Sequence, residues 1–167
     1  LYGDAADHHC SIVYTPLNGS GYLPVTRALT EAGFDHLTVV EEQRLPDGDF
    51  PTCPTPNPEN RQAMTLAIDY ARRLSADLVL ATDPDCDRVG IAVRDGEDYR
   101  LLTGNETGIL LLDFICSQKT KHGTMPKDPV LIKSVVTTDL AGRIAKRYGV
   151  RTVNVLTGFK YIGEQIS

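Results

Sequence analysis

Short apolar segments that favour strands alternate with amphipathic segments that favour helices along this 167-residue chain. Such alternation is typical of an α/β fold with largely parallel strands, because each helix returns the chain to the start of the next strand. The sequence therefore predicts a three-layer α/β/α fold with a mixed, mostly parallel sheet. The strands are expected at residues 11–15, 37–40, 77–81, 89–93, 99–102, 130–136 and 151–156.

Local capping signals place the helices. An Asx cap, a proline and an acidic first turn coincide at Asn57-Pro58-Glu59, and they predict the start of a helix that ends near Ser75. A capping box at residues 103–106 precedes another helix at 107–117. The remaining helices are expected from the turn at 18–21 to Gly33, at 139–148, and from Thr157 onward.

A polar stretch with two prolines and one glycine divides the chain. We expect a first α/β domain over residues 1–118, folding over roughly 8–118, and a linker over 119–129. Residues 130–167 then read as the incomplete start of a second, similar α/β domain, with too few elements for a large core.

Composition excludes several classes of function. The net charge is −5, with 17 basic and 22 acidic residues, so the charge of the chain does not indicate binding to nucleic acid. No apolar run reaches the roughly 18–20 residues that span a bilayer, so no membrane partner is expected. The four cysteines contain no CxxC pair, which excludes a zinc knuckle and favours reduced thiols in a cytoplasmic protein.

The clearest chemical signal follows the apolar strand at 77–81, where Asp83, Asp85 and Asp87 alternate. Three carboxylates this close repel one another and favour a nearby cation, and a hard ion such as Mg²⁺ suits oxygen ligands. The alternative is a solvated acidic turn. An EF-hand is excluded, because its sixth position needs glycine and its twelfth needs glutamate, where this chain has Arg88 and Arg94.

Arg88 adjoins this acidic cluster and allows two interpretations. It neutralises the carboxylates, or it donates to a phosphate that also contacts the metal. A haloacid-dehalogenase-type phosphatase also places two alternating aspartates after a strand, and Asp83 would then be the nucleophile. That alternative fits less well, because such enzymes prefer Thr or Val where Asp87 stands.

Two further turns join a strand to a helix. The turn at residues 18–21 could hold an anion at a helix N-terminus, but a structural turn is the favoured interpretation. Residues 157–160 have the same arrangement with an added lysine, which is by default a surface residue. The adjacent His8 and His9 are expected to have no function.

Several motifs together resemble the α-D-phosphohexomutase superfamily, the phosphoglucomutases and phosphomannomutases. Their order and spacing match the second of that family's four domains and the opening of the third, and they look most like the phosphoglucomutase and phosphopentomutase-like branch. The first turn of that branch often carries histidine where this chain has Asn18. The motifs are Val13-Tyr14-Thr15-Pro16-Leu17-Asn18-Gly19-Ser20-Gly21, Pro46-Asp47-Gly48-Asp49-Phe50-Pro51, Pro56-Asn57-Pro58-Glu59, Asp83-Pro84-Asp85-Cys86-Asp87-Arg88, Leu102-Thr103-Gly104-Asn105-Glu106 and Thr157-Gly158-Phe159-Lys160.

The resemblance implies an activity and a set of site residues. A phosphoserine on the first domain would exchange a phosphoryl group with a sugar phosphate through a bisphosphorylated sugar, with glucose 1,6-bisphosphate as activator. It implies that Mg²⁺ is held by Asp83, Asp85 and Asp87, and that Arg88 steadies the phosphoryl group. Thr157, Gly158 and Lys160 would contact the substrate.

The chain also lacks parts of the family's pattern. It has no serine before a His-Asn-Pro triplet, no Glu-x-Ser and no fourth-domain phosphate loop. We therefore expect the central fragment of a phosphoglucomutase, inactive alone, whose partners are a sugar phosphate and the missing domains I, III and IV of the same polypeptide. The alternatives are a phosphomannomutase or phosphopentomutase fragment, or a non-catalytic module that binds metal or sugar phosphate.

Overall fold

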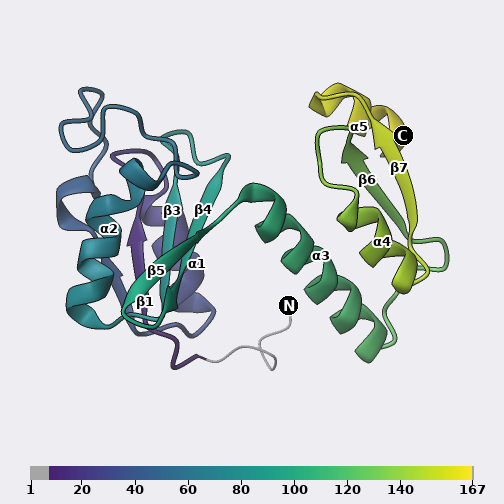
Figure 1. The fold of residues 1–167 in the computed structure, drawn as a ribbon, viewed down its shortest axis with the longest axis horizontal. Coiled ribbons are helices and arrows are strands. Elements are labelled where there is room, and N and C mark those ends of the chain that lie inside the picture. Colours follow the sequence, from purple (N-terminus) through teal and green to yellow (C-terminus); the bar gives the residue numbers. More distant parts are fainter. Residues whose placement is uncertain (1–7, 167) are drawn as a thin grey trace. The chain divides into compact units, whose positions relative to one another are not determined.

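The computed structural model of the chain describes residues 8–166, which form two compact units, 8–104 and 105–166 (Figure 1). Residues 1–7, expected at the start of the first domain, lie outside the described residues. Both units alternate strands and helices, so the predicted α/β class is confirmed. Each unit has its own sheet and its own core, and each is described separately below.

The first unit is built on a five-stranded sheet in the order β2-β1-β3-β4-β5. Its strands are β1 (Ile12–Thr15), β2 (Leu37–Val39), β3 (Leu78–Thr82), β4 (Val89–Asp95) and β5 (Asp98–Leu102). The pairs β1–β2 and β1–β3 are parallel, whereas β3–β4 and β4–β5 are antiparallel. The sheet is therefore mixed. Its parallel half brings the carboxyl ends of β2, β1 and β3 to one edge.

Helices lie on opposite sides of this sheet, with α2 (Arg61–Leu74) on one side and α1 (Tyr22–Glu31) on the other (Figure 1). The short 3-10 helix η2 (Glu41–Gln43) follows β2. The central strand β1 is buried along its whole length, as expected for a strand covered on both faces. This arrangement is the predicted three-layer α/β/α fold.

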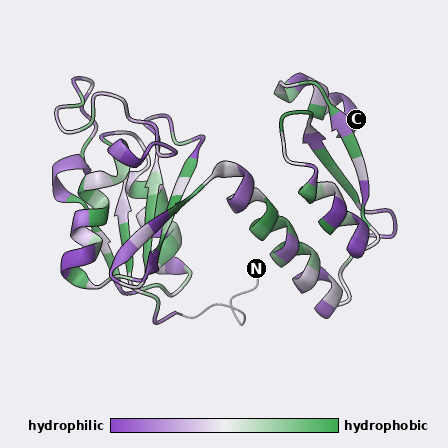
Figure 2. Ribbon diagram, in the orientation of Figure 1, coloured by the Kyte–Doolittle hydropathy of each residue, from purple (hydrophilic) through white to green (hydrophobic). Residues whose placement is uncertain are grey.

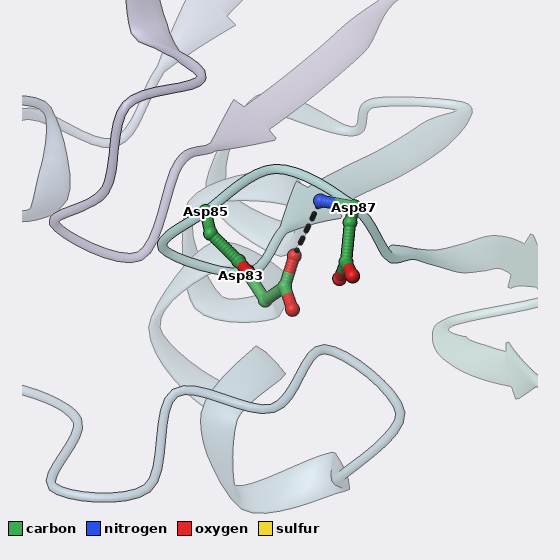
Figure 3. A group of neighbouring side chains, drawn as sticks. All are labelled: Asp83, Asp85 and Asp87. Carbon is green, nitrogen blue, oxygen red and sulfur yellow. Dashed lines mark hydrogen bonds between the residues drawn. The ribbon is translucent and has the colours of Figure 1, made fainter.

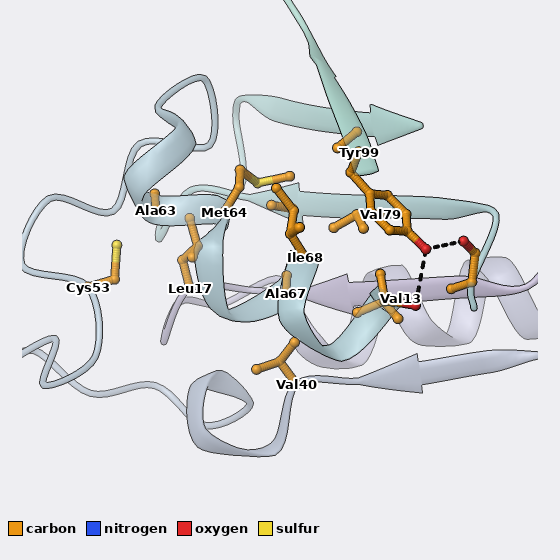
Figure 4. Packing of buried hydrophobic residues seen from close by; sticks show 14 residues of the cluster. Val13, Leu17, Val40, Cys53, Ala63, Met64, Ala67, Ile68, Val79 and Tyr99 are labelled. Carbon is orange, nitrogen blue, oxygen red and sulfur yellow. Dashed lines mark hydrogen bonds between the residues drawn. The ribbon is translucent and has the colours of Figure 1, made fainter. Parts of the chain in front are cut away.

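The main core lies between α2 and the sheet (Figure 4). Helix α2 presents a strip of buried side chains at helical spacing, among them Met64, Ala67 and Ile68, and in Figure 2 it alternates between hydrophilic and hydrophobic residues. Tyr99 on β5 closes one end of this core, where its hydroxyl donates to the carbonyl oxygens of Ala71 and Ala76. The end of α2 is thereby fastened to β5.

The start of α2 differs from the predicted cap. The cap residue is Asn60, whose side-chain oxygen accepts the Gln62 N–H at 3.0 Å, so the helix begins later than residues 57–59. Asn57 instead closes a turn, since its Oδ1 accepts the Glu59 N–H at 3.0 Å. Pro58 is fully buried, and its carbonyl lies where a side chain on Gly90 would project. This packing against β4 holds the turn outside the helix.

The second unit contains two parallel strands, β6 (Val130–Ser134) and β7 (Arg151–Val155), joined through α4 (Leu140–Arg147). Helices α3 (Gly104–Lys121) and α5 (Phe159–Ile166) complete its elements. Its buried cluster is small, with Cys116, Ala145 and Val150 surrounded by partly buried neighbours. The predicted incomplete second α/β unit therefore has the small core that so few elements can build.

The division between the units falls between Gly104 and Asn105, earlier than the expected domain end at residue 118. Helix α3 also runs to Lys121, so the first residues of the expected linker at 119–129 are helical. The physical reason is packing. Cys116 on α3 is buried with Ala145 and Val150, and Asp113 accepts a hydrogen bond from the Tyr148 hydroxyl at 2.8 Å.

Within residues 8–166, no helix combines the length and the apolar character that crossing a bilayer requires. Among the described residues, none of the four cysteines forms a disulfide bond.

Candidate metal centre

The three predicted ligands lie in the connection between β3 and β4, residues 83–88, which we call the Asp loop. Because Thr82 pairs with Val89 across antiparallel strands, the Asp loop closes a hairpin. It also follows the carboxyl end of β3, beside the carboxyl end of the parallel strand β1. Ligands of open α/β sheets commonly bind at that edge.

Asp83 is the buried anchor of the Asp loop, with 1% of its surface exposed. Its Oδ1 accepts the backbone N–H groups of Asp87 at 3.1 Å and Arg88 at 3.0 Å, and its Oδ2 accepts the Arg88 Nε–H at 2.9 Å. Burial alone would raise the pKa of Asp83. The hydrogen bonds from Arg88 and Asp87 outweigh burial and hold the pKa below its ordinary value, so the carboxylate is ionised at neutral pH.

Asp85 and Asp87 are exposed, unlike Asp83. One oxygen from each of the three carboxylates lies within 4.8 Å of the other two (Figure 3). The negative charge of Asp85 raises the pKa of Asp87, with smaller contributions from desolvation and from Asp83. A cation would relieve this repulsion, as the sequence pattern predicts.

The spacing of these oxygens fits a small divalent cation. Octahedral Mg²⁺ holds its oxygen ligands at about 2.0–2.1 Å, which separates neighbouring ligands by roughly 3 Å and opposite ligands by roughly 4 Å. The three carboxylate oxygens lie within 4.8 Å of one another, which is close to the separations in an octahedral Mg²⁺ site. Asp85 and Asp87 are exposed, so their side chains have room to approach a bound ion more closely. Asp83 can join them through Oδ2, which accepts one N–H, that of Arg88 Nε, and keeps a second lone pair.

The turn that follows β1 holds the Asp loop in place. A side chain on Gly19 would overlap the Cα and carbonyl of Pro84, so the two backbones touch. Ser20 donates to the Pro84 carbonyl oxygen twice, from its N–H at 2.8 Å and from its hydroxyl at 3.0 Å. These contacts agree with the favoured interpretation of residues 18–21 as a structural turn.

Two structural features of the Asp loop and its surroundings were not predicted from the sequence. The hydroxyls of Tyr14 and Thr82 share a buried hydrogen bond of 2.8 Å beside Gly21, and burial raises the pKa of Tyr14 to about 12. Cys86 has a left-handed backbone, with φ of 63°. Tyr14 and Thr82 are 68 positions apart in the sequence, so no local pattern predicts their hydrogen bond. Cys86 lies within a predicted motif, but the motif does not predict its backbone conformation.

Arg88 lies where the sequence places it, against the acidic cluster. Its Nε is 2.9 Å from Asp83 Oδ2 and 3.7 Å from Asp87 Oδ1. The side chain remains 55% exposed, so it neutralises the cluster from the solvent side. These ion pairs are what the charge-neutralising interpretation predicts, and the exposed part of the guanidinium leaves the phosphate-binding interpretation open.

The predicted substrate contacts lie in the second unit. Thr157, Gly158 and Lys160 are exposed around the start of α5, directly after the carboxyl end of β7. Gly158 has a left-handed backbone with φ of 135°, and the Lys160 ammonium lies 4.6 Å from the centre of the Tyr161 ring. Within the first unit, the Asp loop brings Asp83, Asp85, Asp87 and Arg88 together. Thr157, Gly158 and Lys160 belong to the second unit.

The sequence matches two consecutive families of domains. Residues 3–96 match "Phosphoglucomutase/phosphomannomutase, alpha/beta/alpha domain II", and residues 103–167 match "Phosphoglucomutase/phosphomannomutase, alpha/beta/alpha domain III". The chain therefore belongs to the phosphoglucomutase/phosphomannomutase family. The resemblance to phosphoglucomutases and phosphomannomutases that the sequence motifs indicated is confirmed.

Curated relatives include both named activities. The chain is 39% identical over 157 residues to a phosphomannomutase of Mycoplasmoides pirum, and the match covers 94% of this chain and 28% of that protein. It is 38% identical over 167 residues to a phosphoglucomutase of Staphylococcus saprophyticus, covering 99% of this chain and 30% of that protein. The chain thus spans less than a third of the length of either relative.

Solved structures show the same fold. A phosphoglucomutase/phosphomannomutase family protein from Burkholderia thailandensis superposes with a TM-score of 0.74 at 20% identity, over 94% of this chain and 31% of that one. An N-acetylphosphoglucosamine mutase from Aspergillus fumigatus, solved with glucose 1,6-bisphosphate, has a TM-score of 0.59 at 19% identity. That match covers 98% of this chain and 31% of the other.

Proposed function

We propose that this chain is the metal-binding central part of a Mg²⁺-dependent phosphoglucomutase that interconverts glucose 1-phosphate and glucose 6-phosphate. The observation that carries the proposal is the convergence of three carboxylate oxygens within 4.8 Å in the Asp loop of a phosphohexomutase-type domain. A phosphoserine outside this chain would carry the transferred group, and glucose 1,6-bisphosphate would activate the longer protein. The enzyme is expected to be cytoplasmic, and this chain alone to be inactive.

The residues of the Asp loop suit such a role. Asp83, ionised and fixed by Arg88, would anchor the metal, and the exposed carboxylates of Asp85 and Asp87 would close around it. Bound Mg²⁺ would neutralise charge on the phosphoryl oxygens, which phosphoryl transfer requires. The partly exposed Arg88 guanidinium would donate to the same phosphoryl group.

The second unit would supply contacts to the sugar phosphate. Thr157 offers a hydroxyl, Gly158 a backbone N–H and Lys160 an ammonium group, and all three are exposed. These are donors that suit an anionic substrate. The binding role of this group, like the metal role of the Asp loop, is part of the proposal.

Burial of Asp83 argues against the phosphatase alternative. A nucleophilic carboxylate must present one oxygen to phosphorus, but Asp83 is 1% exposed and both of its oxygens accept hydrogen bonds. This environment favours a ligand over a nucleophile. A dehalogenase-type phosphatase, whose nucleophile would be Asp83, is therefore the weaker candidate.

A phosphomannomutase is the second candidate, because the relatives bear both names at nearly equal identity, 39% and 38%. A phosphopentomutase, and a module that binds metal or sugar phosphate without catalysis, are the remaining candidates. The candidate enzymes differ in the sugar phosphate that they convert, and the binding module converts none. One set of activity assays therefore distinguishes all of these candidates.

The test is a coupled assay on the longer protein that contains this chain, with glucose, mannose and ribose 1-phosphates, Mg²⁺ and a trace of the corresponding bisphosphate. We expect turnover of glucose 1-phosphate that is abolished by EDTA and by Asp85→Asn. Asp49→Asn removes one carboxylate from an exposed loop elsewhere in the same unit and serves as the matched control. Preference for another sugar would change the named substrate, and no turnover of any of them would favour the non-catalytic module.

A further inference from the structure

A fully buried glutamine lies at the end of η2, at the same edge of the sheet as the Asp loop. Gln43 has 0% of its surface exposed, and a buried amide is costly unless its donors and acceptors are paired. Its Oε1 accepts the Thr15 hydroxyl at 2.7 Å, and its Nε2 donates to Thr52 Oγ1 at 3.0 Å. Its backbone carbonyl also accepts the Asn18 N–H at 2.9 Å.

These bonds join three segments that are distant in sequence. Thr15 ends β1, Gln43 follows β2, and Thr52 belongs to the long loop between η2 and α2. The Thr15 hydroxyl donates to Gln43 and accepts the Leu17 N–H at 3.1 Å, so its orientation depends on the Gln43 acceptor. Gln43 therefore controls how the chain leaves β1.

The turn after β1 needs this support. Leu17 and Asn18 are consecutive residues with left-handed backbones, φ 48° and 57°, a conformation that side-chain-bearing residues seldom adopt. Asn18 is tied down further, because its Nδ2 donates to the carbonyls of Glu42 at 3.3 Å and Leu45 at 3.0 Å. Such a conformation persists only where its surroundings enforce it.

The same turn holds the Asp loop. Gly19 and Ser20 follow directly, and both contact Pro84, which lies between Asp83 and Asp85. The contacts therefore run without interruption from Gln43 through the turn to the Asp loop. They cross the sheet in the strand order β2-β1-β3.

We propose that Gln43 is a positioning residue for the Asp loop: its buried amide fixes the turn at residues 16–20, and the turn fixes the backbone that presents the three carboxylates. Gln43 makes no contact with those carboxylates among the described interactions of residues 8–166. The consequence for metal affinity rests on the proposed function, but the consequence for the Asp loop backbone does not.

The test compares amide hydrogen exchange by NMR in the wild-type chain, Gln43→Met and Ile68→Val. Methionine keeps the length and volume of glutamine but removes both hydrogen bonds, while Ile68→Val weakens the core without touching this network. We expect the Asp87 and Arg88 amides, which donate to Asp83, to lose protection about tenfold or more in Gln43→Met, as the loss of one or two buried hydrogen bonds would give. Amides of β4 and β5 should change alike in both variants.

A second variant keeps the test informative if Gln43→Met does not fold. Thr52→Val removes only the acceptor of Gln43 Nε2, from an exposed position, and should produce the same loss at the Asp loop in smaller measure. Two results would overturn the positioning role. One is an equal loss of protection in the Asp loop and in β4 and β5 of Gln43→Met or Thr52→Val. The other is a selective loss of Asp loop protection in Ile68→Val as well.

A Mg²⁺ titration by calorimetry on the same variants separates the two proposals. Weaker Mg²⁺ binding in Gln43→Met, with unchanged binding in Ile68→Val, is the expected result. Selective loss of Asp loop protection with no Mg²⁺ binding to any variant would support the positioning role and contradict the metal site. Unchanged protection and unchanged Mg²⁺ affinity in Gln43→Met would overturn the positioning role and leave the metal site standing.

Discussion

The two units of the chain use the same alternation of strands and helices but reach different degrees of burial. The unit at residues 8–104 encloses its central strand on both faces and buries an extended cluster between α2 and five strands. The unit at 105–166 has two strands, and its hydrophobic cluster contains only three buried residues among those described. Strand and helix patterns thus specify elements, whereas the number of elements that share one core sets the stability.

The two methionines give the sharpest contrast between the units. Met64 on α2 is completely buried in the core of the first unit, whereas Met125 is partly buried beside the small cluster. We expect Met64→Ala to cost about 2–5 kcal/mol, because it leaves a cavity in a packed core. Met125→Ala should cost roughly 1 kcal/mol, because less apolar surface is lost. Hydrogen exchange, measured separately for the amides of each unit, gives both free-energy costs. Equal costs would contradict the conclusion that the first unit has the more tightly packed core.

Two glycines test how tightly the Asp loop is held within the first unit. Gly19→Ala would force a methyl group into the Pro84 backbone, so we expect a loss of about 1–3 kcal/mol and weaker protection of the Asp loop amides. The matched control is Gly48→Ala, since nothing lies within 4 Å of the added methyl group there. Urea denaturation compares the two. If Gly19→Ala were as stable as Gly48→Ala, the turn at residues 18–21 would not pack tightly against the backbone of the Asp loop.

The depressed pKa of Asp83 gives a pH test in metal-free buffer. A carboxyl whose pKa is lowered by folding stabilises the protein above its unfolded value of about 4, and that contribution is lost as the pH falls through the folded value. Asp83→Asn should therefore be less stable than the wild type by about 1–2 kcal/mol at pH 7. The difference should narrow below about pH 4. Asp49→Asn is the control, and a difference that does not change with pH would contradict the role of Asp83 as an ionised anchor.

The smallest expected effect lies in the second unit. Tyr148→Phe removes the hydrogen bond to Asp113, which joins the end of α4 to α3 at 2.8 Å. Because this bond is partly exposed, we expect a cost of about 1 kcal/mol or less. Exchange rates of the α3 amides measure it. A cost as large as that of Met64→Ala would mean that the second unit relies on polar contacts rather than on its small core.

The sequence predicted the features that depend on neighbouring residues. The order of strands and helices, the convergence of Asp83, Asp85 and Asp87, and the pairing of Arg88 with them all arise within a few residues. Features set by distant contacts were missed. The cap of α2 moved from Asn57 to Asn60 because Pro58 packs against Gly90 on β4, which local capping rules cannot detect.

The same limit applies to α3 and to the support of the Asp loop. Helix α3 was expected to end the first domain because a polar stretch with two prolines and a glycine follows it. That composition change does not reveal which core the helix joins, whereas the fold buries Cys116 of α3 with Ala145 and Val150. The hydrogen bond between Thr15 and Gln43 spans 28 positions, and that between Tyr14 and Thr82 spans 68. Neither pair has a characteristic spacing, so their role in holding the turn and the Asp loop appears only in the fold.

The central claim is that the Asp loop binds Mg²⁺, and the most direct test is an NMR titration of the chain with Mg²⁺. If Mg²⁺ binds there, the backbone amides of residues 83 and 85–88 should show saturable shifts, which Asp85→Asn should abolish and Asp49→Asn should retain. Binding to the folded state should also raise the midpoint of thermal unfolding in the wild type. Absence of shifts at millimolar Mg²⁺, or equal shifts in wild type and Asp85→Asn, would contradict the claim.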